Sequence, residues 1–381
     1  MSGRLYASRW AVGDAEAFRR TVRHFVNKEL VPRQEAWRAE HRPDAEAWRG
    51  AGRAGLLLPD VPQQYGGGGG TFAHEAVVLE ELAGAGVQLG TTVQSMAARY
   101  LLAYGSEVQR RRWLPALSRG ELVAAVAMTE PDAGSDLQAM RTSARREGEH
   151  YVVRGSKTFV TNGTLAGLVC LAVRTGGPGM RALSLLMVET QGLAGYRAGR
   201  PLEKVGMHGQ DTCELFFDDA RVPAENLVGS EEGSGFAQMM EQLAYERLSI
   251  AVQAVAAMER AVALTARYVK ERKAFGQPLM DLQNTRFKLA ECRTLAHVGR
   301  VFLDSCIERI VDGHLDDASA AMAKYWLTEC QGRVMDECVQ LHGGYGYMAE
   351  YPIARMWADA RVQRIYGGAN EIMKELIAWS L

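Results

Sequence analysis

Polar residues after a predicted strand near the middle of the chain could bind a ligand. The segment 127–136, AMTEPDAGSD, places Thr129, Ser135 and Asp136 around a turn that contains Gly134. Such a bend presents hydroxyl and backbone N–H donors to the polar edge of a ligand. It suits equally well a capped turn in which Ser135 or Asp136 accepts from the next N–H groups. The residues alone leave both interpretations open.

A second candidate segment, 340–373, has two glycine pairs that flank a short helical pattern. Gly343 and Gly344 precede it and Gly367 and Gly368 follow it, so backbone N–H groups can approach a ligand without a Cβ in between. A proline predicts the start of the helix. Its expected inward face carries Ile353, Met356, Trp357 and Ala360. The same spacing also fits two ordinary helix–helix connections in a bundle.

The elements that must position these segments fall into three parts. Helical periodicity in the first part covers 11–40, 71–84, 87–103 and 106–118. Helical periodicity in the last part covers 236–272, 281–312, 316–342, 353–365 and 370–379. We therefore predict a mixed α and β fold with a helical N-terminal domain (1–121), a middle antiparallel β-barrel-like domain (122–228) and a C-terminal four-helix bundle (229–381).

The middle part contains short β-rich runs separated by turn signals, among them YVVRG, KTFVTNG, LVCLAVR, ALSLLMVE and CELFFDD. We expect residues 154–157 to form a hairpin-like turn between the first two of these runs. Five consecutive glycines at 66–70 open no βαβ unit, and we interpret them as a surface loop.

Composition excludes several classes of function. The chain of 381 residues has 44 basic and 45 acidic residues and a formal charge of -1, which gives no electrostatic case for nucleic acid. The six cysteines form no CxxC pair and no zinc-type cluster, so we predict reduced core thiols and no metal site. The N-terminus lacks an apolar core and no continuous run of 18 apolar residues occurs, so we expect a soluble, cytoplasmic protein without membrane insertion.

Three separated motifs resemble one known family. AMTEPDAGSD at 127–136, ERKAFGQPL at 271–279 and the glycine-flanked segment 340–373 are similar, in the same order, to the acyl-CoA dehydrogenase family of flavoenzymes, most closely its long-chain type. The likeness covers nearly the whole chain. It implies FAD as cofactor, an acyl-CoA substrate oxidised to the trans-2-enoyl thioester and an electron-transfer flavoprotein as electron acceptor. It also implies a homotetramer built as a dimer of dimers.

The resemblance also assigns cofactor contacts to residues of this chain. The flavin ring would lie against Val126, Met128, Thr129, Gly134, Ser135, Phe159 and Thr161. Its last contacts would fall on Ala369, Asn370 and Glu371. The pyrophosphate and adenine would contact Arg272, Phe275 and Gln283, because a guanidinium pairs with two phosphate oxygens. Gln340, Gly343 and Gly344 would reach FAD from a neighbouring subunit.

Several positions depart from the family pattern. Asp132 replaces a common glycine, Phe159 a frequent tryptophan and Ala369 the usual threonine. Because Ala369 removes one hydroxyl contact, we expect FAD to bind less tightly. Gly367 stands where the medium-chain pattern has its catalytic glutamate, so the base must lie elsewhere.

The base is predicted from a Glu-Arg step on a bundle helix. Oxidation of a saturated thioester requires a base at the α-carbon and a hydride acceptor at the β-carbon. The long-chain and isovaleryl types carry a glutamate directly before an arginine, and this chain has Glu246 before Arg247. We predict Glu246 as the base, with Glu241 and Glu371 as rivals. The substrate would contact Ser135, Tyr245, Arg247, Gly367 and Gly368, with a backbone N–H near Gly367 polarising the carbonyl.

Three other readings stay open at this point. The same fold and flavin could serve a monooxygenase or oxidase, in which the reduced flavin meets oxygen. The thioester could be borne by a carrier protein instead of CoA. A non-enzymatic relative that binds DNA or a partner is disfavoured by the balanced charge.

Overall fold

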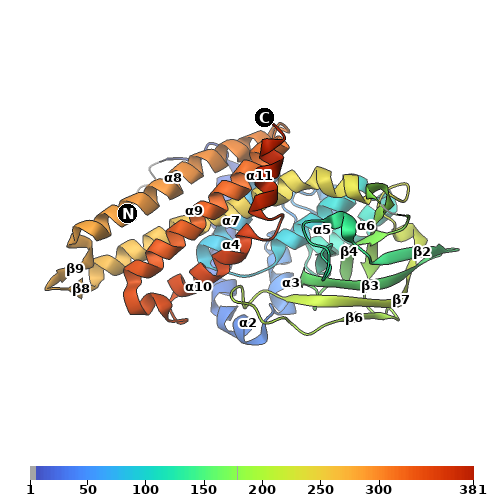
Figure 1. Cartoon of the computed structure of the whole chain (residues 1–381), viewed down its shortest axis with the longest axis horizontal. Coiled ribbons are helices and arrows are strands. Elements are labelled where there is room, and N and C mark those ends of the chain that lie inside the picture. Colours follow the sequence, from blue (N-terminus) through green and yellow to red (C-terminus); the bar gives the residue numbers. More distant parts are fainter. Residues whose placement is uncertain (1–5, 178) are drawn as a thin grey trace.

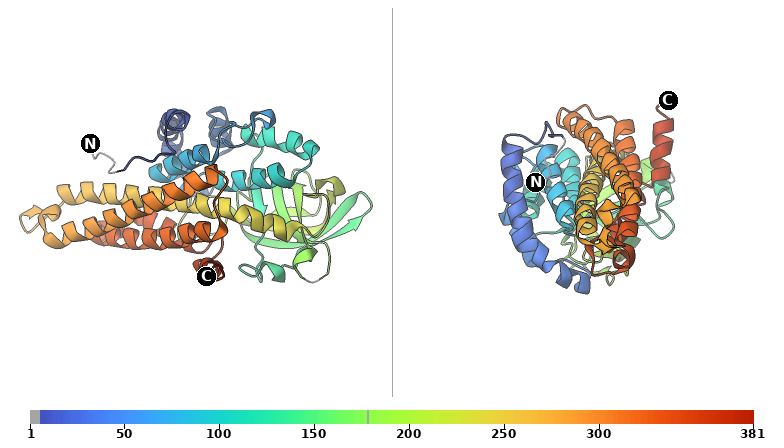
Figure 2. Two further views of the ribbon diagram at one scale, coloured as in Figure 1. Left: turned by 90° about the horizontal axis from the view of Figure 1, so that it is seen from above. Right: turned by 90° about the vertical axis from the view of Figure 1, so that its left-hand side faces the viewer.

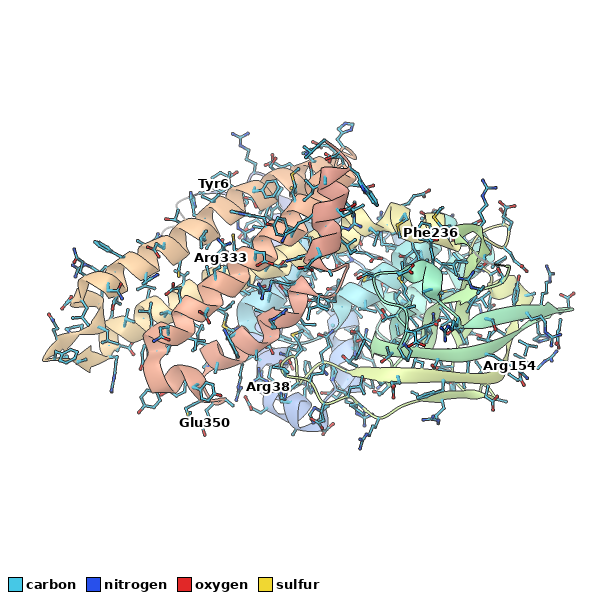
Figure 3. All side chains as sticks on the ribbon, viewed as in Figure 1. Tyr6, Arg38, Arg154, Phe236, Arg333 and Glu350 are labelled. Carbon is cyan, nitrogen blue, oxygen red and sulfur yellow. The ribbon has the colours of Figure 1, made fainter. Side chains whose placement is uncertain are left out.

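The computed structural model describes residues 6–177 and 179–381, and it shows a curled sheet at one end of the molecule and long helices at the other (Figure 1). Two further views agree with this arrangement (Figure 2). Arg154 marks the sheet end and Phe236 lies near the sheet, while Arg333 and Glu350 lie in the part of the molecule formed by the long helices (Figure 3). The residues that position a site are therefore spread along an elongated molecule.

The N-terminal part is helical, as predicted. Its helices are α1 (Asp14–Phe25), α2 (Gln34–Glu40), α3 (Ala45–Arg53), α4 (Phe72–Ala85), α5 (Thr91–Tyr104) and α6 (Glu107–Ser118). The single helix expected over 11–40 is interrupted by a π turn at Val26–Leu30 and a 3-10 turn at Val31–Arg33. Pro32 lacks a backbone N–H, which accounts for the shift in hydrogen bonding there.

The glycine run at 66–70 lies largely at the surface, as expected, but it is held in place. The N–H of Gly68 donates to the carbonyl of Leu58 at 3.1 Å, and that of Gly69 to Val61 at 2.8 Å. A Cβ on Gly67 would lie 2.2 Å from the carbonyl oxygen of Val61, so only glycine permits this close approach.

The middle part is a sheet, seven-stranded within the described residues, with the order β1-β4-β2-β3-β7-β6 and β5 paired with β4. Its strands are β1 (Ala124–Ala127), β2 (Ser143–Glu147), β3 (His150–Thr161), β4 (Leu168–Arg174), β5 (Leu183–Glu189), β6 (Tyr196–Ala198) and β7 (Thr212–Pro223). Most pairings are antiparallel, as predicted, but β1 and β2 run parallel to β4. The short strands β2 and β6 were not predicted from the sequence.

The predicted hairpin at 154–157 is wrong, because β3 continues through it as one strand. The register against β7 shifts between Val153 and Gly155, and Gly155 has a φ of +139°. A Cβ there would lie 2.6 Å from Oγ1 of Thr142. The glycine therefore marks a bulge at a close approach of two chain segments, and not a reversal of the chain.

The C-terminal part consists of long helices with short connections. They are α7 (Gly235–Glu271), α8 (Gln283–Val311), α9 (Asp317–His342), α10 (Pro352–Ala360) and α11 (Asn370–Ala378), with the hairpin β8 (Lys273–Ala274) and β9 (Gln277–Pro278) after α7. The two short helices α10 and α11 pack on α9, and α4 packs on α7. The predicted fold class is confirmed, and N- and C-terminal helices share one apolar core.

Two details of the helical parts refine the predictions. On α10, Ile353, Met356 and Ala360 are buried as expected, but Trp357 is 45% exposed and lies off that face. By length and composition alone α7 could span a membrane, yet 61% of its most apolar window is buried inside the structure, which identifies a core helix. All six cysteines are buried thiols, as predicted.

Candidate active site

Glu246 is a buried carboxylate in the part of α7 that lies against α5. Its Oε1 accepts a hydrogen bond from the hydroxyl of Tyr100 at 3.0 Å. Burial raises the pKa of Glu246 to about 7, although the Tyr100 bond and Arg247 oppose the shift. The two rival carboxylates, Glu241 and Glu371, are exposed. A general base needs a pKa near the working pH, so burial favours Glu246 among the three.

Glu246 lies close to the strand that leads into the bend at 127–136. Burial and the nearby Glu246 carboxylate raise the pKa of the Cys170 thiol on β4. Cys170 is paired in register with Val126 on β1. The predicted base and the predicted flavin-contacting strand are therefore neighbours in the structure.

A buried ion pair, which the sequence did not predict, holds the bend in place. The Nζ of Lys157 on β3 donates to Oε1 of Glu130 at 2.8 Å and to the carbonyl of Met128 at 3.0 Å. Glu130 also accepts from the N–H groups of Arg141 and Thr142, at 2.7 and 2.9 Å. Burial lowers the pKa of Lys157 to about 8. The sequence feature that could have revealed the pair is the position of Lys157 among the inward-facing residues of a strand, where a charged side chain requires a partner.

The bend and β3 present an aromatic ring beside open backbone. Phe159 is 68% exposed and has a φ of +56°, unusual for a non-glycine residue. The N–H of the preceding Thr158 donates to the carbonyl of Thr129 at 2.9 Å, which joins strand and bend. A Cβ on Gly134 would meet no atom of the described residues within 4 Å. An exposed ring at a strained residue, on a strand that this bond joins to the bend with Gly134, fits a flat ligand such as a flavin.

The departures from the family pattern in this bend are visible. Asp132 is exposed and lies 3.3 Å from the guanidinium of Arg141. Ser135 is exposed, whereas Val126, Met128 and Thr161 are partly buried. The residues predicted to contact the flavin ring lie on β1, on the bend that follows it and on β3.

A buried lysine holds the turn at 367–370 against α7. The sequence did not predict this lysine. The Nζ of Lys324 on α9 donates to the carbonyl of Gly368 at 2.6 Å and to Oδ1 of Asn370 at 2.9 Å. Burial lowers the pKa of Lys324 to about 8. A Cβ on Gly367 would lie 2.3 Å from Cδ1 of Ile250. Ile250 is one helical turn beyond Glu246, so this turn covers the same face of α7.

Other predicted residues of this turn have internal partners. The amide of Asn370 donates to Thr328 and Glu329, each at 3.0 Å, so its side chain is used within the protein. Ala369 is partly buried, and Gly368 is exposed.

The two neighbours of Glu246 differ in what they contact. Arg247 is buried, and its Nε has no hydrogen-bond partner among the described residues. Tyr245 donates its hydroxyl to Asp60 at 3.0 Å, under the guanidinium of Arg99. Arg247 is therefore the neighbour with an unused donor, while the Tyr245 hydroxyl is already bonded inside the N-terminal part.

The remaining predicted cofactor residues lie at the other end of the bundle. They are all exposed, and they are Arg272, Phe275, Gln283, Gln340, Gly343 and Gly344. Phe275, in the β8–β9 hairpin, is 93% exposed. Arg272 follows Glu246 by roughly 39 Å of helix at the usual rise per residue, and Figure 1 shows the hairpin at the end remote from the sheet. One chain does not bring the two groups together.

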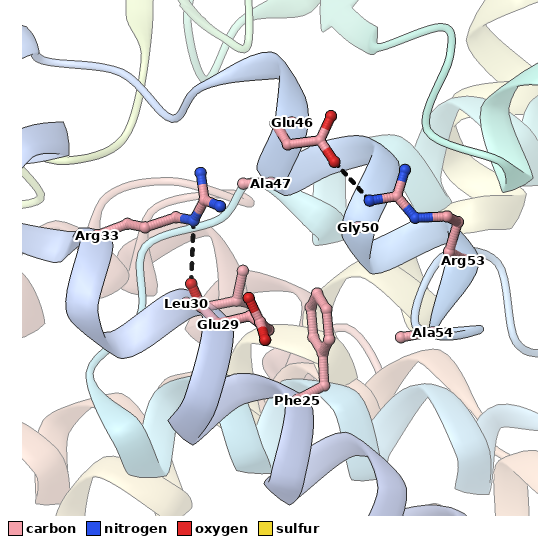
Figure 4. Close-up of a pocket in the computed structure, with 9 residues that line it drawn as sticks. All are labelled: Phe25, Glu29, Leu30, Arg33, Glu46, Ala47, Gly50, Arg53 and Ala54. Carbon is pink, nitrogen blue, oxygen red and sulfur yellow. Dashed lines mark hydrogen bonds and ion pairs between the residues drawn. The ribbon is translucent and has the colours of Figure 1, made fainter.

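A separate surface hollow of about 410 Å³ lies between α1 and α3. Figure 4 shows the ring of Phe25 in it beneath a charged rim that includes Arg33, Glu46 and Arg53. The Glu46 carboxylate pairs with Arg53. This hollow contains none of the residues predicted to bind cofactor or substrate.

Comparison with known proteins identifies the family. The acyl-CoA dehydrogenase family is matched by its N-terminal domain over residues 13–121, its middle domain over 125–220 and its C-terminal domain over 233–381. The long-chain specific acyl-CoA dehydrogenase, mitochondrial, of Sus scrofa is 45% identical over 371 residues, which are 95% of this chain and 85% of that protein.

Two solved structures extend the comparison. An acyl-CoA dehydrogenase from Geobacillus kaustophilus has a TM-score of 0.95 and 44% identity and covers 98% of this chain and 99% of its own. A glutaryl-CoA dehydrogenase from Mycobacterium smegmatis in complex with FADH2 has a TM-score of 0.91 and 27% identity. It covers 98% of this chain and 95% of its own. The chain belongs to the acyl-CoA dehydrogenase family of FAD-dependent oxidoreductases.

Proposed function

We propose that this chain oxidises a saturated acyl-CoA thioester to the trans-2-enoyl thioester, with Glu246 as the base that removes the α-proton. The observation that carries the proposal is a buried carboxylate, 5% exposed, with a pKa of about 7, beside the strand predicted to contact the flavin. At neutral pH such a group is partly ionised and can accept a proton. When bound, FAD supplies the acceptor for the β-hydride.

The chain's own residues would prepare the substrate for this proton transfer. Lys157 and Glu130 hold the bend against β3, and Lys324 holds the turn at 367–370 over α7. Backbone N–H groups of that turn are candidates to polarise the thioester carbonyl, which makes the α-proton more acidic. Arg247, buried and with an unused donor, is a candidate contact for the thioester side of the substrate.

We further propose that each cofactor site is shared by two subunits of a dimer within a homotetramer. The exposed group around Arg272 and Phe275 lies too far along α7 from Glu246 to serve the same cofactor in one chain. A neighbouring subunit that presents this group would complete the site, in agreement with the resemblance. In a closed dimer both subunits would give and receive the same residues.

The experiment is anaerobic mixing of the FAD-loaded protein with a series of straight and branched acyl-CoA thioesters. Loss of the oxidised flavin absorbance together with formation of the 2-enoyl thioester supports the proposal. Flavin that stays oxidised with every acyl-CoA but is reduced by a carrier-protein thioester would move the substrate to that class. The series also measures chain length, which the residues do not fix.

The electron acceptor is tested next. We propose an electron-transfer flavoprotein, on the strength of the family. Rapid reoxidation of the substrate-reduced flavin by oxygen, with hydrogen peroxide released, would instead support an oxidase.

We also propose a cytoplasmic location, supported by six buried free thiols, which are typical of reducing compartments. The Sus scrofa relative is described as mitochondrial.

A further inference from the structure

We infer that Tyr100 is a positioning residue, which fixes one oxygen of Glu246 and leaves the other to receive the substrate's α-proton. The inference rests on the proposed function. The Tyr100 hydroxyl donates to Oε1 of Glu246 at 3.0 Å. Oε2 accepts no hydrogen bond from the described residues, yet it is not fully enclosed. The carboxylate is thus held by one oxygen and free at the other.

Tyr100 is itself rigidly placed. It is fully buried on α5, in an apolar cluster that includes Leu101 and Cys170. The helix α5 packs against both α7 and β1. The surrounding side chains therefore hold the Tyr100 ring in place, and its hydroxyl donates to Glu246 on the neighbouring helix α7.

The chemistry of the pair is directional. Burial and Glu246 raise the pKa of Tyr100 well above its ordinary range, so the hydroxyl stays protonated and remains a donor at any working pH. A donor to a carboxylate favours the charged form. Tyr100 therefore opposes the effect of burial on Glu246 and keeps a fraction of it ionised near neutral pH.

The same helix offers a matched control. Tyr104, one turn after Tyr100, donates to Oε2 of Glu241 at 2.6 Å. Glu241 is also on α7, but it is exposed. Tyr104→Phe removes the same atom and the same kind of bond from a carboxylate that has no proposed role.

The first test compares the pH dependence of flavin reduction by an acyl-CoA in the wild type, Tyr100→Phe and Tyr104→Phe. In the pH–rate profile of Tyr100→Phe, loss of the donor should move the acid limb to a pH about one unit higher. A hydrogen bond to a charged group stabilises it by about the free energy that corresponds to one pKa unit. The rate should fall roughly tenfold below the limb and change little well above it. Tyr104→Phe should keep the wild-type limb. An unmoved limb in Tyr100→Phe overturns the inference.

The second test needs no turnover. A double-mutant cycle of Tyr100→Phe and Glu246→Gln is measured by equilibrium unfolding of the FAD-loaded protein between pH 5 and pH 9. We expect coupling between the two positions that grows as Glu246 ionises. Coupling that is independent of pH indicates a purely structural contact and overturns the inference. If acyl-CoA reduces the flavin of Glu246→Gln at the normal rate, the proposed function fails. That result differs from an unmoved acid limb or a pH-independent coupling, which overturn only the role of Tyr100.

Discussion

The two ends of α7 differ in that the sheet end buries titratable groups with hydrogen-bond partners, whereas the hairpin end exposes large aromatic side chains. At the sheet end, Glu246, Lys157 and Lys324 are buried charged or titratable groups, and each has a hydrogen-bond partner within the chain. At the hairpin end, Phe275 is 93% exposed and Tyr347 82% exposed. Large exposed apolar side chains in one region mark a surface that another molecule covers.

The difference teaches how one site can be assembled from two chains. The sheet end contains the proposed base and the bend that Lys157 and Glu130 hold in place, but not the exposed group around Arg272. The hairpin end offers a guanidinium, an aromatic ring and free glycine backbone, which suit a phosphate-bearing ligand but have nothing to act upon in their own chain. The proposed dimer, in which unlike ends meet, would bring the two groups together.

The largest expected effect comes from removing the base at the sheet end. Glu246→Gln keeps the size of the side chain but cannot accept a proton at neutral pH, so flavin reduction by acyl-CoA should slow roughly 10³-fold. Stopped-flow absorbance under anaerobic conditions measures it. Glu241→Gln is the control, because Glu241 is an exposed carboxylate on the same helix. Equal slowing in both variants would contradict the assignment.

Next in size is the buried ion pair under the bend. Lys157→Met leaves Glu130 charged and buried without its partner, which should cost about 3–5 kcal/mol of unfolding free energy. Denaturant titration of the FAD-loaded protein measures the change. The control is Arg154→Ala on the same strand, which breaks the exposed pair with Asp219 and should cost under about 1 kcal/mol.

Similar losses in the Lys157→Met and Arg154→Ala variants would show that burial does not distinguish the two pairs. That outcome would also remove the reason to regard the sheet end as the rigid half of the molecule.

A smaller effect follows from the pKa of Glu246. Because its pKa is raised from 4.5 unfolded to about 7 folded, the protonated carboxyl favours folding below about pH 4.5, and this contribution is lost as the pH rises through 7. Glu246→Gln has no such dependence. Its stability relative to the wild type should therefore rise by about 3 kcal/mol between pH 4.5 and pH 7.5.

Paired denaturant titrations at several pH values measure this difference. A flat difference across the range would mean that Glu246 is ionised at its ordinary pKa, and the desolvated base at the sheet end would lose its support.

The sequence predicted the fold better than it predicted the internal polar contacts. Helices such as α7 and α9 follow from long 3.6-residue periodicity, which burial of one face enforces. The bulge at Gly155 was misread as a turn, because a glycine between two apolar runs is compatible with both. Lys157 and Lys324 were not predicted, since a buried lysine is recognised only once its partner from another element is known.

For the candidate site, the sequence indicated which residues take part, but not how they are arranged in space. The Glu-Arg step on a bundle helix identified Glu246 only through a family likeness, and its burial beside Tyr100 is a tertiary fact. The separation of Arg272 from Glu246 along one straight helix could have been read from the chain, because rise per residue is fixed. What the sequence does not contain is the geometry of the proposed dimer, in which the two ends would meet.

The smallest expected effect is a partial recovery of activity when two inactive or weakened variants are combined. It tests the proposed dimer directly. We expect Arg272→Ala alone to weaken FAD binding, and Glu246→Gln alone to be inactive. Co-expression of the two variants should restore activity, because in a mixed dimer one site receives Glu246 from one subunit and Arg272 from the other. Random assortment would leave about a quarter of all sites intact.

The matched control replaces Arg272→Ala by Arg267→Ala, an exposed arginine one turn earlier on α7. That variant should be active alone, and its mixture with Glu246→Gln should show only the activity of the Arg267→Ala subunits. If the Arg272→Ala and Glu246→Gln mixture shows no gain over its components, although mixed oligomers are recovered by two affinity tags, the two residues serve the same subunit's site. The far end of α7 would then be a surface for some other contact, and the sheet end would have to bind the whole cofactor alone.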